Sequence, residues 1–410
     1  MIDRNWIGAC AALLLYCSAY PCEGWGQEAA PNSDAPGSRE PPAPGPELLK
    51  FTPEQIEQAY AGRKMPEAVE MYLVIARGGQ LDGRSGWFHP ASSRFSWPRL
   101  VQQQGGDVER PLTREQFRGD PQIFTQLDRD RDGAISRADL DWSDDHPWVR
   151  QSALINRWFR RLDVNGDGLL TAEEWTAFFT RASTDGQPLA FEQLRDALVP
   201  PASGFFPGDM PTKEMLIKGF LEGEIGSLQE GPKVDQVAPD FTVRPLGGGA
   251  PLKLSERIGQ RPVVLVFGNF TCGPFRSLYP QVEAVWKRQR DNAEFLFVYV
   301  REAHPTDGWV MKSNENVGVS VAQPKTFEER QKVAQQCSTL LKSQLPFYVD
   351  DVHDAVGHQY SAMPARLYVI DSQGRVAYQS GRGPFGFKPL EMEQALLLLR
   401  LEEAAQASPP

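Results

Sequence analysis

A single cysteine follows a strongly apolar run in the stretch FGNFTCGPF, residues 267–275. Cys272, Gly273 and Pro274 supply the first three positions of a C-x-x-C redox motif, and Phe275 occupies the fourth. Proline is favoured in the first turn of a helix, so we expect the thiol at a helix N-terminus. The helix dipole and the free N–H groups there stabilise a thiolate and lower the pKa of the thiol. We predict a reactive thiol at Cys272; a buried inert cysteine is the alternative.

A second cysteine must be considered because the motif cannot close a disulfide on itself. Cys337 lies 65 residues further along the chain (337 − 272), in a helical pattern. It is a candidate for resolving an oxidised Cys272, and a packed core cysteine is the alternative. The chain has 5 cysteines, and Cys10, Cys17 and Cys22 all lie close to its start. Two remaining cysteines do not make a disulfide scaffold.

Two acidic stretches, 128–139 and 163–174, follow the calcium-loop template of oxygen ligands at positions 1, 3, 5, 9 and 12 with glycine at position 6. A pair of acidic surface turns is the alternative. Asp139 replaces the usual glutamate at position 12 and reaches less far, so we expect the first site to bind more weakly. The candidate ligands are Asp128, Asp130, Asp132, Ser136 and Asp139 in the first loop and Asp163, Asn165, Asp167, Thr171 and Glu174 in the second.

The spacing of the two loops resembles that of an EF-hand pair. They start 35 residues apart (163 − 128), which leaves room for two flanking helices. Ile135 and Leu170, at position 8 of each loop, are expected to join the loops through a short β bridge. We expect the pair to bind two Ca²⁺ ions and to act as a structural brace rather than as a sensor.

The net charge of the chain limits its binding partners, and the residues at its beginning suggest its localisation. The chain has 410 residues and a formal net charge of −10, without a block of Lys or Arg, which argues against nucleic acid and anionic membrane surfaces as partners. The beginning, with Arg4 and the apolar run WIGACAALLLYCSAY, is typical of a signal peptide. We therefore expect an exported protein, periplasmic or extracellular. A lipid anchor on Cys17 or Cys22 is less favoured and would be the route to a membrane.

The order of predicted elements gives the fold class. Apolar runs at 261–268 and 294–300 read as central strands around a helix at 274–290, and a hairpin and an amphipathic helix follow. This βαβ and ββα layout resembles an α/β thioredoxin-like domain, a central mixed sheet flanked by helices, beside an all-α EF-hand pair. The expected parts are a signal peptide at 1–30, a disordered linker at 31–48, a helical region of unknown role at 49–110, the EF-hand pair at 111–185, a connector at 186–233, the thioredoxin-like domain at 234–400 and a flexible tail at 401–410.

Three segments in the thioredoxin-like region resemble iodothyronine deiodinases. They are FGNFTCGPF at 267–275, YVREAHPTDGW at 299–309 and MPARLYVIDSQGRVAYQSGRGPFGF at 363–387. The resemblance implies that Cys272 stands where the family has its selenocysteine nucleophile, preceded by Thr271. It further implies an oxidoreductase that removes iodine reductively, with an external thiol as reductant.

The same resemblance implies roles for further residues. Tyr299, Glu302 and His304 match residues that deliver protons and contact substrate, although a solvated turn is the alternative for this segment. Arg366 matches a cation that binds the amino-acid end of the iodothyronine, and a surface arginine is the alternative. Pro364 matches the cis-proline that faces the active cysteine in thioredoxin folds. Chemically, a thiolate can attack iodine, a Glu–His pair can relay a proton and an arginine can bind a carboxylate bidentately.

Departures from the family leave two other functions open. A cysteine is a weaker acid than selenocysteine, and Phe270 stands where family members often have a resolving cysteine. The first alternative to a deiodinase-type enzyme is a general redoxin, that is, a peroxidase or thiol–disulfide oxidoreductase that uses Cys272 and Cys337. The second alternative is a calcium-binding module with an inactive redoxin domain. The expected partners are a small-molecule substrate, iodinated or another electrophile, and a thiol reductant or thioredoxin-like protein.

Overall fold

The computed structural model describes residues 41–78, 88, 91–164, 169–183, 186–198, 211–315 and 317–407. The expected signal peptide and the lipid-anchor candidates Cys17 and Cys22 lie outside these residues, so export stays a prediction. None of the described helices combines the length and apolar character that crossing a membrane requires.

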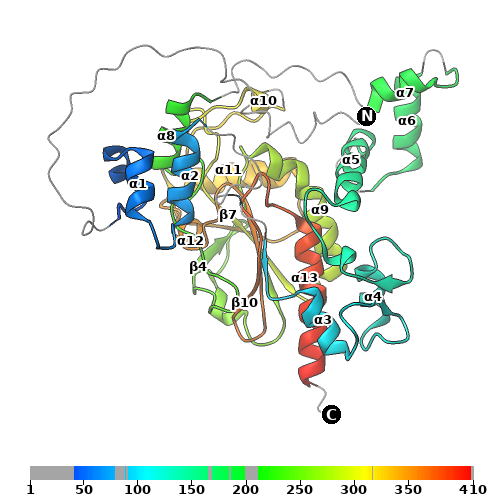
Figure 1. The fold of residues 1–410 in the computed structure, drawn as a ribbon. Coiled ribbons are helices and arrows are strands. Elements are labelled where there is room, and N and C mark those ends of the chain that lie inside the picture. Colours follow the sequence, from blue (N-terminus) through cyan, green and yellow to red (C-terminus); the bar gives the residue numbers. More distant parts are fainter. Residues whose placement is uncertain are drawn as a thin grey trace.

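An eight-stranded mixed sheet forms the centre of the molecule (Figure 1). Its strand order is β1-β10-β9-β6-β7-β8-β4-β5, with β6, β7 and β8 parallel and the other neighbours antiparallel. The strands are β1 (Ser92–Ser93), β4 (Thr242–Pro245), β5 (Leu252–Lys253), β6 (Val263–Gly268), β7 (Glu294–Tyr299), β8 (Phe347–Val349), β9 (Arg366–Ile370) and β10 (Val376–Gln379).

Helices cover both faces of this sheet, as the continuous apolar sequences of β6 and β7 require. One face packs with α9 (Gly273–Gln289), α11 (Phe327–Leu340) and α13 (Pro389–Ala407). The other face packs with η6 (Leu254–Glu256) and α12 (Ala355–Gln359). Helix α10 (Lys312–Glu315) lies between β7 and α11 in the chain. The predicted thioredoxin-like layout is confirmed, while β4 and β8, with four and three residues, are too short for their apolar pattern to be recognised.

The region 49–110 contributes to the sheet domain as well as forming helices. Strand β1 extends the sheet beside β10, and α3 (Trp97–Gln104) packs in a cluster with the leucines of α13. Helices α1 (Pro53–Ala59) and α2 (Glu67–Ala76) lie beside α8 (Lys213–Leu221) of the connector (Figure 1). Helix α1 begins after Thr52, which forms a capping box with Gln55.

The expected linker 31–48 is wrong in its last residues. Residues Pro46–Lys50 form the 3₁₀ helix η3, and Leu48 is fully buried among α1, α2 and α8. A single leucine in a Pro-rich stretch gives no periodic signal, and only its tertiary neighbours show that it belongs to a core.

The acidic loops do not pair with each other as expected. Strand β3 (Ala134–Ile135) of the first loop pairs with β2 (Leu112–Thr113), while Leu170 of the second loop is 37% exposed. The loops are separated by one helix, α5 (Pro147–Leu162), where two helices were expected. The 3₁₀ turn η5 (Ala138–Leu140) begins at the end of the first loop. The first loop follows α4 (Pro121–Leu127), and the second leads into α6 (Ala172–Ala182) and α7 (Phe191–Leu198).

Candidate functional site

Cys272 lies at the corner between β6 and α9, as predicted. It is the N-cap of α9, and Pro274 stands in the first turn of the helix. Phe275 is buried, with its ring centroid 5.5 Å from that of Phe297 and 5.7 Å from that of Phe387. A Cβ at Gly268 would lie 2.4 Å from the Phe275 ring, so this glycine allows the close packing. The fourth motif position is therefore part of the core, and no second thiol is needed there.

The prediction of a lowered thiol pKa is wrong for this structure. Cys272 is only 2% exposed, and burial raises the pKa of its thiol to about 11. The N–H of Phe275 and the charge of Arg276 oppose this rise but do not overcome it. Desolvation penalises the charged form more than a helix terminus stabilises it. Near pH 7 the neutral thiol therefore predominates in this closed arrangement.

Three of the predicted site residues form one buried hydrogen-bond network beside Cys272. Glu302 accepts the backbone N–H of Thr271 at 2.9 Å and its hydroxyl at 2.8 Å, both through Oε2. The other oxygen, Oε1, accepts the hydroxyl of Tyr299. Burial raises the pKa of the Glu302 carboxyl and holds the pKa of Tyr299 well above its ordinary range. Burial therefore favours the protonated form of both groups in this network.

His304 joins the same network through its backbone. Its N–H donates to the Thr271 hydroxyl at 3.0 Å. Its ring Nδ1 lies 3.1 Å from the carbonyl oxygen of Trp309, so this nitrogen carries the ring proton, and the two rings meet edge to face with centroids 4.7 Å apart. The structure thus brings Thr271, Tyr299 and Glu302 together beside Cys272, and the backbone of His304 is joined to the same network.

Asn269 organises this site, and sequence reasoning missed it. Its Oδ1 accepts the backbone N–H groups of Cys272 at 3.0 Å and Ala303 at 3.2 Å, and its Nδ2 donates to the Pro364 carbonyl at 2.9 Å. The Met363–Pro364 peptide bond is cis, as in the cis-proline position expected of this fold. The signal available in the sequence was an asparagine directly after an apolar strand. The structure shows that Asn269 is fully buried, and a buried amide must be hydrogen-bonded.

Arg366 is not part of this site, which corrects the predicted substrate clamp. Its guanidinium donates to the carbonyls of Ser380 at 3.0 Å, Glu230 at 3.1 Å and Ser361 at 3.3 Å, and the side chain is 3% exposed. The guanidinium also lies over the Tyr368 ring, on the face of the sheet opposite to the cluster that contains Cys272. Side chains alternate along a strand, and sequence alone could not tell which face this arginine takes.

A second arginine, which sequence reasoning passed over, lies next to the cysteine. Arg276 donates to the Phe270 carbonyl and, at 2.7 Å, to Oδ1 of Asn314. Asn314 in turn donates to the Thr271 carbonyl at 2.8 Å. Arg276 was the one charged residue in the first turn after the motif, which was the signal available in the sequence.

Cys337 lies in the same buried cluster as Cys272, from α11. Both cysteines are free thiols, and Cys337 is fully buried. Burial raises the pKa of Cys337 well above its ordinary range, and a charge on Cys272 raises it further. A charge on Cys272 is thus felt at the Cys337 thiol.

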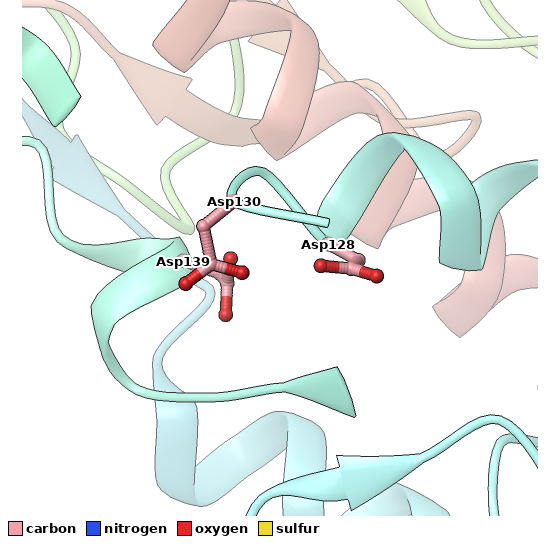
Figure 2. Close-up of side chains that lie close together, drawn as sticks. All are labelled: Asp128, Asp130 and Asp139. Atoms are coloured by element: carbon pink, nitrogen blue, oxygen red, sulfur yellow. The ribbon is translucent and has the colours of Figure 1, made fainter. Parts of the chain in front are cut away.

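The first acidic loop gathers three of its five predicted ligands. One carboxylate oxygen from each of Asp128, Asp130 and Asp139 lies within 4.8 Å of the others (Figure 2). Oδ1 of Asp128 is buried without a hydrogen-bond partner among the described residues, and burial raises the pKa of this carboxyl. Asp132 is outside this carboxylate group and accepts the Ala134 N–H at 2.9 Å, while the Ser136 hydroxyl donates to Asp139 at 2.9 Å. An unpaired buried carboxylate oxygen among acidic neighbours fits a cation such as Ca²⁺.

The second loop is described only in part. Asn165 and Asp167 lie outside the described residues, while Asp163 and Glu174 are buried. Glu174 accepts the backbone N–H of Thr171 at 3.0 Å and its hydroxyl at 3.1 Å, and the two form a capping box at the start of α6.

The comparisons with known proteins match the region of the central sheet and the region of the acidic loops to different families. A family model for iodothyronine deiodinase matches residues 220–399, and an EF-hand model matches 122–141 and 155–179. The thyroxine 5-deiodinase of Gallus gallus is 32% identical over 180 residues, which are 43% of this chain and 67% of that protein. The chain belongs to the iodothyronine deiodinase family. The family consists of oxidoreductases, and the prediction of an oxidoreductase is confirmed at that level.

Other relatives of this deiodinase-family chain match over a smaller share of their length. Thyroxine 5-deiodinases of Sparus aurata and Sus scrofa are 33% and 34% identical over 141 residues. The matched regions are 34% and 33% of this chain, and 50% and 42% of those proteins. The chain thus spans about half the length of these two relatives.

Solved structures show a weaker likeness. A putative protein disulfide isomerase from Bacteroides thetaiotaomicron is 17% identical with a TM-score of 0.30, and covers 43% of this chain and 92% of that one. A putative thiol:disulfide interchange protein DsbE from Chlorobium tepidum is 19% identical with a TM-score of 0.28, and covers 43% and 99%.

Proposed function

We propose that this protein is a cysteine-based reductive dehalogenase that acts on an iodinated aromatic compound and takes its electrons from thiols. The observation that carries the proposal is the buried network from Thr271 through Glu302 to Tyr299, which begins at the residue next to Cys272. Such a network is suited to deliver a proton beside a nucleophilic sulfur. Family membership and the cysteine at a helix N-terminus support the same chemistry.

The reaction balances as follows. The Cys272 thiolate forms a bond to iodine while the carbon–iodine bond breaks, and the electron pair of that bond stays on the ring carbon. The ring carbon takes up a proton, supplied by the Tyr299–Glu302 pair. An external thiol then displaces iodide from the sulfenyl iodide and leaves a mixed disulfide. A second external thiol frees Cys272, so the two electrons come from two thiols that leave as a disulfide.

Access to the sulfur must change during this cycle. Cys272 is 2% exposed, so the substrate can reach it only when neighbouring loops move. His304 and Trp309, which are partly buried, lie on the loop after β7 and are suited to take part in that movement. Opening the site would also hydrate the thiol and remove the main cause of its raised pKa.

We further propose that the EF-hand loops bind Ca²⁺. Asp128, Asp130 and Asp139 would hold it in the first loop, where the unpartnered Oδ1 of Asp128 supports the assignment. A bound Ca²⁺ would offset two of the three negative charges of these carboxylates and fix the loop.

One observation favours a second candidate function, a thiol peroxidase or disulfide oxidoreductase. Cys272 and Cys337 lie in one buried cluster, and a charge on Cys272 raises the pKa of Cys337. A resolving role for Cys337 would make the external thiol unnecessary for the first reduction step.

Both candidates are tested by one experiment on the full chain. Iodide release from an iodothyronine is measured with excess dithiol, in the wild type and in the Cys272→Ser and Cys337→Ser variants. We expect release by the wild type and by Cys337→Ser, and none by Cys272→Ser. Absence of release from a protein whose Cys272 is still alkylated would contradict the proposal. A disulfide between Cys272 and Cys337 after peroxide treatment would then favour the second candidate.

A further inference from the structure

One charged residue at the site, Arg276, is not explained by the proposed proton delivery. It belongs to the first turn of α9, and its backbone N–H donates to the Cys272 carbonyl at 3.1 Å. A Cβ at Gly273 would lie 3.9 Å from its Nη2. The guanidinium therefore lies over the residue that directly follows the cysteine.

The position of this guanidinium is fixed on both sides of the turn. One terminal nitrogen donates to the Phe270 carbonyl, two residues before Cys272. The other donates to Asn314, whose amide holds the Thr271 carbonyl. These bonds use two of the five N–H donors that a guanidinium carries. The bonds therefore tie the cation to the same turn that positions the sulfur.

The charges around Cys272 make this cation significant. The charged side chains that act on the Cys272 thiol are Arg276 from α9 and Glu302 from the β7 side. Tyr299 is hydrogen-bonded to Glu302, and Cys337 from α11 is affected by a charge on Cys272. Glu302 raises the pKa of Cys272 and Arg276 lowers it. Among the described residues, Arg276 is the cation that acts on this sulfur.

We propose that Arg276 is the positioning residue that holds Cys272 as a thiolate when the site opens to substrate. In this way the chain would compensate for the weaker acidity of cysteine relative to selenocysteine at this position. A fixed opposite charge within about 4–6 Å lowers a pKa by about 1–3 units. Burial opposes this effect in the closed arrangement, and opening the loop would remove that opposition. The inference rests on the proposed role of Cys272 as nucleophile.

The test measures ionisation directly in the full-length protein. The Cβ chemical shift of Cys272, in protein labelled with carbon-13 at cysteine, is followed through a pH titration. The variants are Arg276→Met, which removes the charge at similar size, and Arg276→Lys, which keeps it. Arg290→Met is the matched control, because Arg290 ends the same helix and lies over the Trp286 ring at 5.4 Å.

We expect Arg276→Met to move the titration midpoint of Cys272 upward by at least one unit, which is about a tenfold loss of thiolate below the midpoint. Arg276→Lys should lie between that variant and the wild type, and Arg290→Met should match the wild type. Alkylation of Cys272, quantified by mass spectrometry of its peptide at fixed pH, should fall in the same order. A purely structural role would change alkylation without moving the midpoint.

An unchanged midpoint in Arg276→Met, or an equal shift in Arg290→Met, would overturn the inference. If Arg276→Met does not fold, Asn314→Ala provides the test, because it releases the guanidinium from one anchor and should raise the midpoint by a smaller amount. Neither readout requires dehalogenation. Failure of iodide release with a shifted midpoint would therefore count against the proposed function and not against the role of Arg276.

Discussion

At the scale of single residues, Phe275 explains why the redox motif is incomplete. Its ring fills the space between α9, β7 and the segment after β10, where it contacts Phe297 and Phe387. A cysteine there would leave a cavity in the core and cost about 3–5 kcal/mol by analogy with other truncations of buried phenylalanine. The site is therefore built around one thiol, and the proton and the second thiol must come from other groups.

Glu302 gives the sharpest prediction at this scale. Glu302→Gln should keep the fold, because the side chain has the same shape, but should lower iodide release by about 10²–10⁴-fold, the usual contribution of general acid catalysis. The physical reason is that the amide cannot deliver the proton that the ring carbon needs. Alkylation of Cys272 should continue, which separates a loss of protonation from a loss of the nucleophile.

Glu283 provides the matched control for this variant. It is also buried, and it accepts a tyrosine hydroxyl, from Tyr279 at 3.1 Å, and a backbone N–H, from Gln344 at 3.1 Å. Glu283→Gln should leave iodide release nearly unchanged. An equal loss in both variants would show that Glu302 acts through stability rather than through proton delivery.

At the scale of elements, α13 connects the sheet to the first acidic loop. Gln394 donates to the Asp139 carbonyl at 2.7 Å and accepts the Trp142 indole N–H at 2.8 Å. Lys388 lies just before the helix and donates to the Trp142 carbonyl and to Asp144, both at 2.8 Å. The same helix packs against α9, which carries Cys272 at its N-terminus (Figure 1).

Because Glu391 lies in the first turn of α13, we expect the free energy of unfolding to depend on pH. Burial raises the pKa of Glu391 to about 7, with Lys388 opposing the rise. A raised folded-state pKa contributes stability that is present below about pH 4.5 and is lost as pH rises through about 7. Glu391→Gln, which stays neutral, should therefore exceed the wild type in unfolding free energy by about 1–3 kcal/mol near pH 8.

Urea denaturation at low and high pH checks this prediction. The difference between Glu391→Gln and the wild type should shrink as pH falls and vanish below about pH 4.5, where Glu391 is neutral in the folded and the unfolded state. Glu256→Gln, at an exposed position, controls for the loss of one negative charge. A difference that is independent of pH would contradict the assignment of the effect to Glu391 ionisation.

At the scale of the whole molecule, the first acidic loop is integrated with the redoxin domain rather than tethered to it. Helix α4 and β3 bury Phe124, Leu127 and Ile135 in one cluster with Leu397 and Leu401 of α13. Fixing the loop with a cation would therefore also stabilise the helix that covers the sheet.

Calcium should then raise the thermal midpoint of the redoxin domain. At a concentration a hundredfold above the dissociation constant the gain is about 2.7 kcal/mol, or about 5 °C or more for a domain of this size. Asp128→Asn should reduce the shift, and Asp163→Asn in the second loop should reduce it much less. The measurement is thermal unfolding with and without calcium, together with hydrogen exchange of α13. Protection of α13 that does not respond to calcium would contradict this coupling.

The sequence alone was enough for features that depend on local patterns. Periodic apolar runs predicted the βαβ and ββα order, and the loop templates predicted the two acidic loops, because each pattern is complete within a short stretch. The position of Cys272 at a strand–helix corner also followed from its motif, while its grouping with Glu302 and His304 was implied by the resemblance to iodothyronine deiodinases.

Tertiary structure decided the properties that depend on distant neighbours. The raised pKa of Cys272 results from the depth of its burial, and the placement of Arg366 results from the face that its strand presents. The pairing of β3 with β2 and the docking of the first loop on α13 join residues more than 20 and more than 250 positions apart. Such contacts form only when the whole chain packs, because the local sequence around one residue does not indicate which distant residue it will contact.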